Sequence, residues 1–399
     1  MEQKLYFFDS YKTKFKTEIV EKKEIDGKCA VILKGTYFYP ESGGQPSDTG
    51  FIDQVKVEKV KEEDGLIYHF LSNCPKNDIV ECEVDWVTRF DHMQQHTGQH
   101  ILSSVFDEMY SAQTDSFSIG DKFSHITIGK DNLSKDEAFK VEKMVNDIIF
   151  QNKPVKTYFA DEETLSKLPL RKKAKVKNDI RIVEIEGIDY SPCGGTHVKA
   201  TGEIGILKIR KWEKVKNGIR IEFVCGFRAF LDYAFKNEIV NNISNLFSSK
   251  EDAIFEMVKK NIEENKSLKK EIKSLKEVVL KENGKNYLKN AEMKKDIKIV
   301  YKIFEKENFE DVKFILQYIL KEDKTIGVFG HKDIASNIII GRSEDVNIDI
   351  NKIFPEVLKE FNGKGGGNSR ICQGSGDSDK LKIALDKAKI LLIDQINKI

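Results

Sequence analysis

A seam of side chains spaced alternately four and three residues apart runs through the second half of the chain. Its members are Ile254, Val258, Asn261, Asn265, Leu268, Ile272, Leu275 and Val279. Such a repeat keeps every member on one side of an α-helix, so we predict a long charged helix within 236–290 that ends at 281–284. The helix packs either against its own protein or against a second helix in a coiled coil, where the two asparagines would set the register.

The segment before this helix, in a chain of 399 residues, is long enough for more than one domain. Short apolar or alternating runs at 29–33, 51–71 and 79–84 are typical of strands, and 62–65 is typical of a hairpin turn. Several short strands joined by turns predict a small β-barrel over 1–88.

The periodicity then changes to that of a helix, because Phe90, Met93, Thr97, Ile101, Val105 and Met109 recur three or four residues apart. A second helix is predicted over 138–150, and strands over 180–185, 205–212 and 218–225. Helices and strands together predict an α+β domain over 89–235.

The residues after the long helix have their own alternation of strands and helices, which predicts a separate small α/β domain over 291–399. We expect strands at 297–303 and 325–330, and helices at 309–320 and 378–398. A glycine cluster at 363–367 precedes the last helix as a predicted loop. The fold class is therefore α+β and multidomain.

The charges of the chain nearly cancel, with 66 Lys and Arg against 65 Asp and Glu. Net charge gives no argument for nucleic-acid binding, so any such surface has to be local. No leader pattern and no apolar run of membrane-spanning length are present, and we expect a cytoplasmic protein with no membrane partner. The six scattered cysteines argue against a disulfide framework, and most of them are expected to be small buried side chains; Cys193 is the exception.

His96 and His100 stand four residues apart in the predicted helix at 90–109. This spacing places two imidazoles one turn apart on the same side, where both can bind one metal ion. By itself the pair is a weak signal, since surface histidines reach this spacing by chance.

A second pair follows in Cys193-Gly194-Gly195-Thr196-His197, after a turn-rich segment between two predicted strands. Glycines let this loop fold tightly, so the thiolate and the imidazole can point to one centre. Together the two pairs give three nitrogens and one sulfur, a donor set suited to one zinc ion per chain. Zinc is either structural, with all four ligands closing the site, or catalytic, with room for water or substrate.

The two pairs, His96-x-x-x-His100 and Cys193-Gly-Gly-Thr-His197, resemble those of the editing domain of alanyl-tRNA synthetase and its freestanding AlaX relatives. The similarity continues through 201–209 and 218–222. Upstream, the segment 38–50, which contains Gly43-Gly44-Gln45-Pro46, resembles the N-terminal barrel signature of that family. Downstream, 365–367 and 373–376 resemble the DHH-associated domain. The resemblance thus covers nearly the whole chain, in the family's order.

Some positions depart from the family pattern. Residues 368–372, Asn-Ser-Arg-Ile-Cys, replace the longer glycine run and the Pro-Asp-like step that often follow. Thr127 stands where an acid is expected, in a segment that resembles a strand near the editing pocket. Nothing resembles an ATP-binding aminoacylation core, which favours hydrolysis without synthesis.

The resemblance implies hydrolysis of the ester that joins serine or glycine to tRNA(Ala). An alanine pocket cannot strongly reject glycine or a side chain that merely adds a hydroxyl, so a second site has to remove these products. The backbone N–H groups of Gly194 and Gly195 are candidates for stabilising the oxyanion. Thr196 or Gln45 is a candidate for recognising the serine hydroxyl. The alternative is that these loops only shape the site.

Two basic segments are candidates for tRNA contact. The first comprises Lys364, Gly365, Gly366, Gly367 and Arg370, where backbone amides and cations would bind phosphates. The second is the run that contains Arg171, Lys172 and Lys173, although a solvated surface is the commoner explanation of such a run. A homodimer through 250–282 or through the C-terminal domain is a further possible association.

Three other functions compete with editing. A tRNA-binding or assembly module would keep a structural zinc and lack hydrolysis. A metallopeptidase is disfavoured because Thr97 stands where such enzymes place a glutamate after the first histidine. A glycine-loop nucleotide-binding protein is disfavoured because no lysine-serine step accompanies the glycines.

Overall fold

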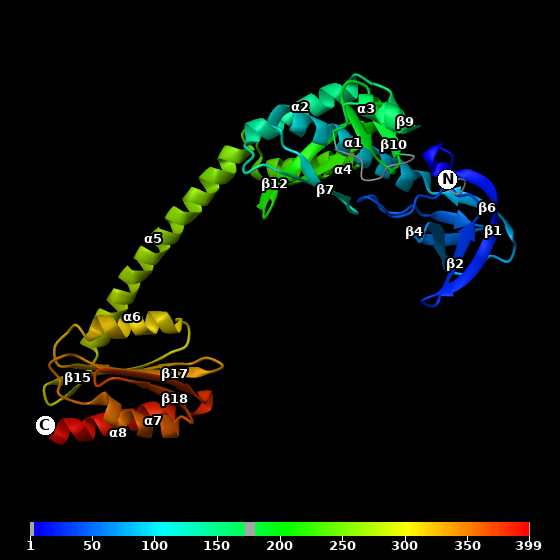
Figure 1. Ribbon diagram of the computed structural model, residues 1–399. Helices are drawn as coiled ribbons and strands as arrows, with labels where there is room; N and C mark the ends of the chain where they lie inside the picture. Colours follow the sequence, from blue (N-terminus) through cyan, green and yellow to red (C-terminus); the bar gives the residue numbers. More distant parts are fainter. Residues whose placement is uncertain (1–3, 172–179, 399) are drawn as a thin grey trace. The chain divides into compact units, whose positions relative to one another are not determined.

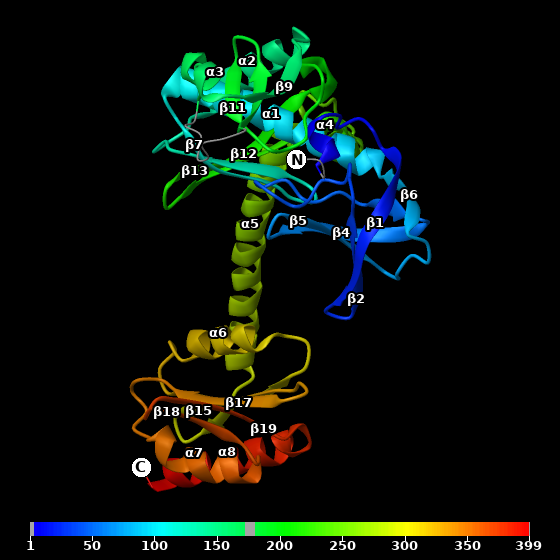
Figure 2. The ribbon, with the colours of Figure 1, turned by 45° about the vertical axis from the view of Figure 1, so that its right-hand side comes forward.

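The computed structural model describes residues 4–171 and 180–398, and it divides into two compact units, Met1–Leu246 and Phe247–Ile399. The first unit contains a closed barrel of six strands in the order β1-β2-β5-β4-β3-β6 (Figure 2). A short 3₁₀ turn, η1 (Leu5–Phe7), precedes it. The strands are β1 (Lys14–Ile25), β2 (Lys28–Leu33), β3 (Gly50–Ile52), β4 (Val55–Glu63), β5 (Leu66–Leu71) and β6 (Ile79–Val84). This confirms the predicted barrel.

The predicted hairpin turn lies between β4 and β5, where Glu63 pairs with Leu66. Asp64 and Gly65 both have positive φ, as a tight two-residue hairpin turn requires. Alternate side chains of the strands point inward and form the barrel core around Val31, Val57 and Val80.

One cysteine expectation was wrong, because Cys29 in β2 forms a disulfide with Cys74, 45 residues along the chain. Strand pairing explains this, since Cys29 lies opposite Leu71 and the loop after β5 passes back beside it. Cys82, Cys225 and Cys372 are free and buried, as expected of small apolar side chains.

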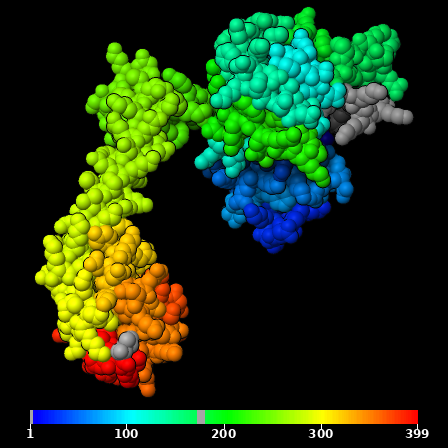
Figure 3. Space-filling model, turned by 90° about the vertical axis from the view of Figure 1, so that its left-hand side faces the viewer, coloured from blue at the N-terminus to red at the C-terminus, as the bar shows by residue number. Residues whose placement is uncertain are grey.

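The rest of the first unit is α+β, and in Figure 3 the barrel, in blue, packs directly against it. A three-stranded sheet has the order β11-β10-β9, and a four-stranded sheet has the order β12-β13-β8-β7. The strands are β7 (Thr114–Ile119), β8 (Ser124–Ile128), β9 (Val155–Ala160), β10 (Ile180–Ile185), β11 (Asp189–Pro192), β12 (Leu207–Val215) and β13 (Gly218–Cys225). The helices are α1 (Trp86–Tyr110), α2 (Lys135–Phe150), α3 (Glu162–Lys167), η2 (Thr201–Ile204) and α4 (Gly226–Phe247).

Helix α1 is the central element of this unit. Asp85 caps its first turn by accepting a hydrogen bond from Val87 N, and Ser111 ends it in a left-handed conformation. Its residues are buried almost continuously from His92 to Phe106. Side chains on every face of this stretch therefore point into the protein, which is what a helix that carries buried ligands requires.

The second unit is a three-layer α/β/α structure whose six-stranded sheet has the order β14-β15-β16-β17-β19-β18. The strands are β14 (Glu292–Lys294), β15 (Ile297–Phe304), β16 (Thr325–His331), β17 (Ser336–Arg342), β18 (Lys364–Gly367) and β19 (Ile371–Gly376). The helices are α5 (Ile254–Lys289), α6 (Phe309–Ile319), α7 (Ile350–Glu360), η3 (Ser378–Lys380) and α8 (Leu381–Lys398). Figure 1 shows α6 on one face of the sheet and α7 and α8 on the other.

The predicted long helix is two helices, because the chain breaks at 248–253, where Ser248 has a positive φ. Helix α5 also continues past Gly284, where an end was expected, to Lys289. A β-carbon on Gly284 would lie 2.6 Å from Cδ1 of Tyr318, so this glycine lets α6 approach α5. The seam residues from Leu268 to Val279 are exposed, and their pairing with a second helix stays a prediction.

The glycine cluster before the last helix is also not the loop that was expected. Residues Lys364–Gly367 form the edge strand β18, which pairs with β19. A β-carbon on Gly365 would lie 2.3 Å from the carbonyl oxygen of Gln373. Glycine is therefore required there for the close approach of two strands, which sequence patterns alone do not reveal.

None of the helices in the described part of the chain has the length and apolar content needed to cross a bilayer.

Candidate metal centre

The structure brings the four predicted metal ligands together inside the first unit. The candidate ligand atoms of His96, His100, Cys193 and His197 all lie within 4.8 Å of one another. Helix α1 supplies the first two, and the loop after β11 supplies the others. Sγ of Cys193 lies 3.5 Å from Nε2 of His96 and 3.4 Å from Nε2 of His197. This is a compact N₃S set that could hold a metal ion.

Each of the three imidazoles is also held through its other nitrogen. Nδ1 of His96 lies 2.8 Å from Oε1 of Gln45, and Nδ1 of His100 lies 2.6 Å from Oδ2 of Asp189. Nδ1 of His197 lies 3.0 Å from Oγ1 of Thr97. Acceptors at Nδ1 fix the proton there and leave Nε2 as the lone-pair nitrogen, which is the arrangement around metal-binding histidines in general.

The electrostatics of the cluster also favour metal binding. Burial by itself raises the pKa of the Cys193 thiol, but His96 and His197 outweigh it and hold that pKa well below its usual value. Burial, together with His96, lowers the pKa of His197 to about 3. Cys193 thus favours the thiolate and His197 the neutral imidazole, which are the forms that bind metals.

His100 behaves differently from its neighbours. Burial lowers its pKa, but hydrogen bonds with Asp189 and Cys193 outweigh burial and raise that pKa to about 9. An ion in the cluster would therefore have to displace a proton from this imidazole.

Gln45 and Thr196, predicted to contact substrate, are instead bonded to each other. Nε2 of Gln45 donates to Oγ1 of Thr196 at 2.8 Å, and Oε1 accepts from Thr196 N at 3.2 Å. Both side chains are buried. Gln45 comes from the barrel loop between β2 and β3, so the barrel supplies a residue that orients His96 of the ligand cluster.

A buried ion pair fixes this loop to α1. Nε of Arg89 donates to both carboxylate oxygens of Asp48, at 3.0 and 3.1 Å, and neither side chain is exposed. Arg89 also donates to the carbonyl oxygens of Ser10 and Tyr37. Because every partner of this guanidinium lies in the first 48 residues, Arg89 holds the barrel against the helix that carries His96.

The two loop glycines differ in what surrounds them. A β-carbon on Gly195 would lie 2.2 Å from Cε1 of His96, whereas one on Gly194 would lie 3.8 Å from Phe7. Gly195 N also donates to Sγ of Cys193 at 3.3 Å, and stabilisation of an oxyanion by the N–H groups of Gly194 and Gly195 stays a prediction. Only at Gly195 does the ligand set require the absence of a side chain.

Two arginines that surround the loop act within the protein. Nη1 of Arg181 donates to the carbonyl oxygens of Cys193 and Gly195, each at 2.9 Å. Nε of Arg171, predicted for tRNA contact, donates to Oδ1 of Asp189 at 2.7 Å. Lys172 and Lys173, from the same basic run, lie outside the described residues.

Sequence reasoning missed Thr97, Arg181 and Asp189 as parts of the site. Asp189 was visible only as the start of a turn-rich segment, and Arg181 only as a polar residue in a strand. Thr97 was assigned to the apolar face of α1. Their contacts join parts of the chain that local patterns do not relate.

A pocket of about 320 Å³ adjoins the ligand cluster. His96, His100 and Cys193 line it, and so do residues 114–117 of β7. Phe117 packs on His96 with ring centroids 5.1 Å apart. β7 and β8 contain the segment singled out beside the pocket, although Thr127 on β8 is not among the residues that line it.

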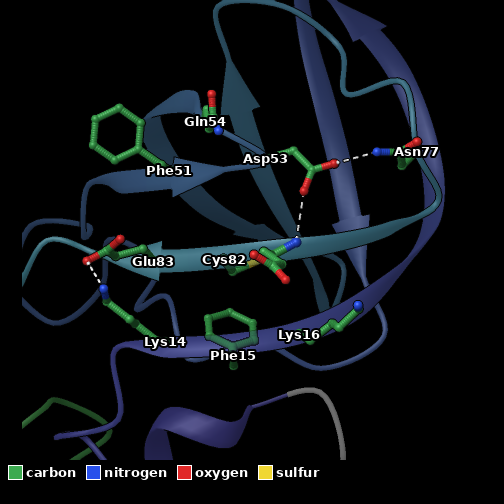
Figure 4. Close-up of a pocket in the computed structure, with 10 residues that line it drawn as sticks. Lys14, Phe15, Lys16, Phe51, Asp53, Gln54, Asn77, Cys82 and Glu83 are labelled. Carbon is green, nitrogen blue, oxygen red and sulfur yellow. Dashed lines mark hydrogen bonds and ion pairs between the residues drawn. The ribbon is translucent and has the colours of Figure 1, made fainter.

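A larger groove of about 1020 Å³ lies on the outside of the barrel, away from this cluster. Figure 4 shows Lys14 paired with Glu83 there, and Asp53 bonded to Asn77. Two lysines and three acidic residues line the groove, and none of the described residues predicted for the site does so.

The predicted tRNA residues of the second unit lie on its edge strand and the turn that follows. Lys364, Gly365, Gly366 and Gly367 form β18 and are exposed. Arg370 pairs with Glu344 across the exposed turn.

Three family models match the chain. One described as the threonyl and alanyl tRNA synthetase second additional domain matches 180–222, one described as tRNA synthetases class II (A) matches 6–88, and one described as the DHHA1 domain matches 296–394. The alanyl-tRNA editing protein AlaX-L of Pyrococcus horikoshii is 32% identical, over 98% of this chain and 99% of its own length. This chain belongs to the AlaX family of alanyl-tRNA editing proteins.

Other relatives match parts of this AlaX-family chain. The alanyl-tRNA editing protein AlaX-M of Methanosarcina acetivorans is 36% identical over 56% of the chain and 98% of its own length. The alanine–tRNA ligase of Korarchaeum cryptofilum is 28% identical over 94% of the chain but only 44% of its own length. The AlaX-family architecture thus covers both units of the chain.

Proposed function

We propose that this chain is a trans-editing hydrolase that removes serine, glycine or both from mischarged tRNA(Ala) at a zinc site. The single observation that carries the proposal is the buried N₃S cluster beside a pocket, with an acceptor on Nδ1 of each histidine. Membership of a family whose relatives are named alanyl-tRNA editing proteins supports the substrate class.

The donor set of the cluster fits zinc. His96, His100, Cys193 and His197 would hold it, and a thiolate with neutral imidazoles is the form in which these groups bind zinc. When bound, zinc supplies a positive charge that polarises the ester carbonyl or orients an attacking water.

The residues of the chain then position the ester rather than attack it. Asp189 and Gln45 keep the histidines in one orientation, and Arg181 holds the carbonyl oxygens of the ligand loop. Since Gln45 and Thr196 are bonded to each other, recognition of a serine hydroxyl falls to polar side chains such as Ser42, Asp115 and Ser116, which line the pocket.

Contact with tRNA is proposed at the edge strand β18 and the turn after it. The outer edge of an edge strand presents backbone N–H groups, and the exposed Lys364 adds positive charge. Arg370 would contribute by exchanging its partner Glu344 for a phosphate. A β-carbon on Gly366 would have nothing within 4 Å, so this position is open to a ligand. The basic run that begins at Arg171 is a second proposed contact. Association of two chains through 250–282 or the C-terminal domain also stays a proposal, as does a cytoplasmic location.

The deciding experiment measures deacylation of Ser-tRNA(Ala), Gly-tRNA(Ala) and Ala-tRNA(Ala) by the wild type and by a His96→Ala/His100→Ala variant, with bound zinc quantified in each. His125→Ala is the matched control, because His125 lies on β8 outside the cluster. We expect the wild type and the control to hydrolyse the Ser or Gly ester and to spare Ala-tRNA(Ala). Only the double variant should lose both this activity and its bound zinc. A wild type that holds zinc and binds tRNA but leaves all three esters intact would instead be a binding module.

A further inference from the structure

Helix α4 of the first unit carries a ridge of large apolar side chains. Phe227, Leu231, Phe235 and Ile239 follow one another in steps of four residues and are 65%, 52%, 62% and 41% exposed. Phe230 is 58% exposed and stacks on Phe227 with ring centroids 5.6 Å apart. A helix that is apolar on its outer face is normally covered in a folded protein.

Polar contacts attach α4 to its own unit on a different face. Arg228 donates to both oxygens of Asp91 on α1, at 2.8 and 2.6 Å. One turn later, Asp232 accepts from Nε of Arg210 on β12 at 2.8 Å. These ion pairs fix the rotation of the helix about its axis, so the exposure of the ridge is built into the fold of this unit.

An apolar pocket of about 630 Å³ adjoins the ridge. Trp86 and Phe90 of α1, which stack on each other with centroids 5.1 Å apart, form one wall, and Phe227 forms another. His92 also lines the pocket, is 7% exposed, and has an Nδ1 atom with no hydrogen-bond partner among the described residues. Phe227 thus belongs to both the α4 ridge and the pocket, so the apolar ridge lies directly beside an apolar pocket.

The size of this surface agrees with that of a dimer interface. A large apolar side chain has on the order of 200 Å² of surface, and only the exposed part of it, between 38% and 77% here, is still available for burial. The five side chains on α4 together with Trp86 and Val87 therefore offer roughly 800 Å² when covered. That is about the area each partner contributes to a standard protein–protein interface. A projection and a hollow on the same surface are self-complementary, as a two-fold interface requires.

The charges of the surface disfavour RNA as the occupant. Among the residues that line the pocket, Arg228 is the only base, and it is bound to Asp91. Lys236 on the same helix is bound to Asp232. Asp121, at the rim of the pocket, is exposed. A surface whose basic side chains are already paired, and which carries an exposed acid, does not attract phosphates. The same near-neutral surface does not repel a second copy of itself.

We propose that this surface is a homodimer interface, in which the α4 ridge of each copy enters the pocket between Trp86 and Phe227 of the other. The two-fold axis passes close to Phe227, since this residue belongs to both ridge and pocket. The interface is distinct from the seam of α5. The inference does not depend on the editing activity.

The test compares sedimentation of the full-length wild type and a Leu231→Glu/Phe235→Glu variant over a wide range of concentration. We expect a concentration-dependent species of twice 45.8 kDa for the wild type. The variant should dissociate at a concentration at least about a hundredfold higher, because it buries two unpaired carboxylates against the apolar pocket of the other copy. Phe139→Glu/Phe150→Glu on α2 is the matched control, since these aromatics are 64% and 70% exposed and lie outside the surface. Unchanged zinc content and melting temperature would show that all variants are folded.

A photo-crosslinking amino acid at position 230 identifies the occupant directly. In a mixture of two differently tagged copies, links from one copy to the peptide that contains Trp86 in the other support the proposal. A monomeric wild type overturns it, and so do links to the second unit of the same chain. It is also overturned if Leu268→Glu/Ile272→Glu on α5 abolishes association while the α4 variant associates normally. If Leu231→Glu/Phe235→Glu weakens tRNA binding but forms the same dimer as the wild type, the proposal is overturned and the surface binds RNA instead.

Discussion

Oδ2 of Asp189 lies 2.6 Å from Nδ1 of His100, and both side chains are buried. The carboxylate keeps the proton of the imidazole on Nδ1, so that Nε2 faces the cluster. We predict that Asp189→Ala lowers zinc affinity by 10–100-fold, the usual effect of removing such a partner. Asp189→Asn keeps an acceptor oxygen, so its zinc affinity should fall less than that of Asp189→Ala. Competition of each variant with a chelator measures its zinc affinity, with Asp131→Ala as a control, because Asp131 is exposed and does not line the pocket. Equal affinities for Asp189→Ala and the wild type would contradict the assignment.

The neighbouring glycines Gly194 and Gly195 provide a matched pair of substitutions. Gly195→Ala places a methyl group 2.2 Å from Cε1 of His96 and should remove most bound zinc and activity. Gly194→Ala meets only Phe7, at the ordinary contact distance of 3.8 Å, and should retain both. Metal analysis and deacylation of each variant check this, and similar losses in the two would show that the loop simply does not tolerate side chains.

Zinc affinity should rise with pH. The pKa of His100 is about 9 without metal, so at neutral pH its proton has to leave when zinc binds. Affinity is then expected to increase about tenfold per pH unit up to about pH 9 and to level off above it. Calorimetry in buffers of different ionisation enthalpy would count the proton released. No release at pH 7 would mean that His100 is already neutral.

His69 makes the barrel sensitive to acid. Burial lowers its pKa to about 4, from 6.5 in an unfolded chain, so the unfolded state takes up a proton first as the pH falls. Stability contributed by neutral His69 is complete above pH 6.5 and is lost on going down to about pH 4, by about 3 kcal/mol in total. The free energy of unfolding, measured with denaturant at several pH values between 4 and 6.5, should fall less steeply with decreasing pH for His69→Gln than for the wild type. Parallel slopes would place the acid sensitivity elsewhere.

Contact of β18 with tRNA predicts a specific salt dependence. Lys364→Ala should weaken tRNA binding and reduce the slope of log affinity against log salt by about one, because one phosphate contact is lost. Lys352→Ala on α7 is a control of the same charge in the same unit. Gly366→Ala has free space around it and should leave the fold intact, so any loss of tRNA binding there would report direct contact. Identical salt slopes for Lys364→Ala and the wild type would remove this strand from the binding surface.

Much of the architecture could be predicted because the spacing of apolar residues along the chain indicates where strands and helices form. The barrel strands, α1 and the strands of both units follow patterns of two and of three to four residues. The break at 248–253 and the strand β18 escaped prediction, because a single positive φ and a glycine-to-strand contact leave no periodic trace. The Cys29–Cys74 disulfide depends on strand register, which the spacing of the cysteines does not encode.

At the candidate site, the ligands could be predicted and their supports could not. His96 with His100 and Cys193 with His197 each stand at a spacing that has chemical meaning by itself. The residues that support the ligands are ordinary polar residues, most of whose partners are distant in the sequence: Gln45, Thr97, Arg181 and Asp189. Gln45 was singled out for substrate contact, which stays a prediction, but its contacts with His96 and Thr196 were not expected.

The order of the four candidate ligands along the chain also has a consequence for synthesis on the ribosome. The barrel loop and the first two ligands emerge early, whereas Cys193 and His197 are translated only after α2 and the three-stranded sheet have begun to appear. A nascent chain that stops short of the loop offers a metal ion two histidines at most, which is weak ligation. On the proposal that the cluster holds zinc, only a nearly finished first unit would bind the ion, and the metal content of the purified protein would report how much of it has completed folding.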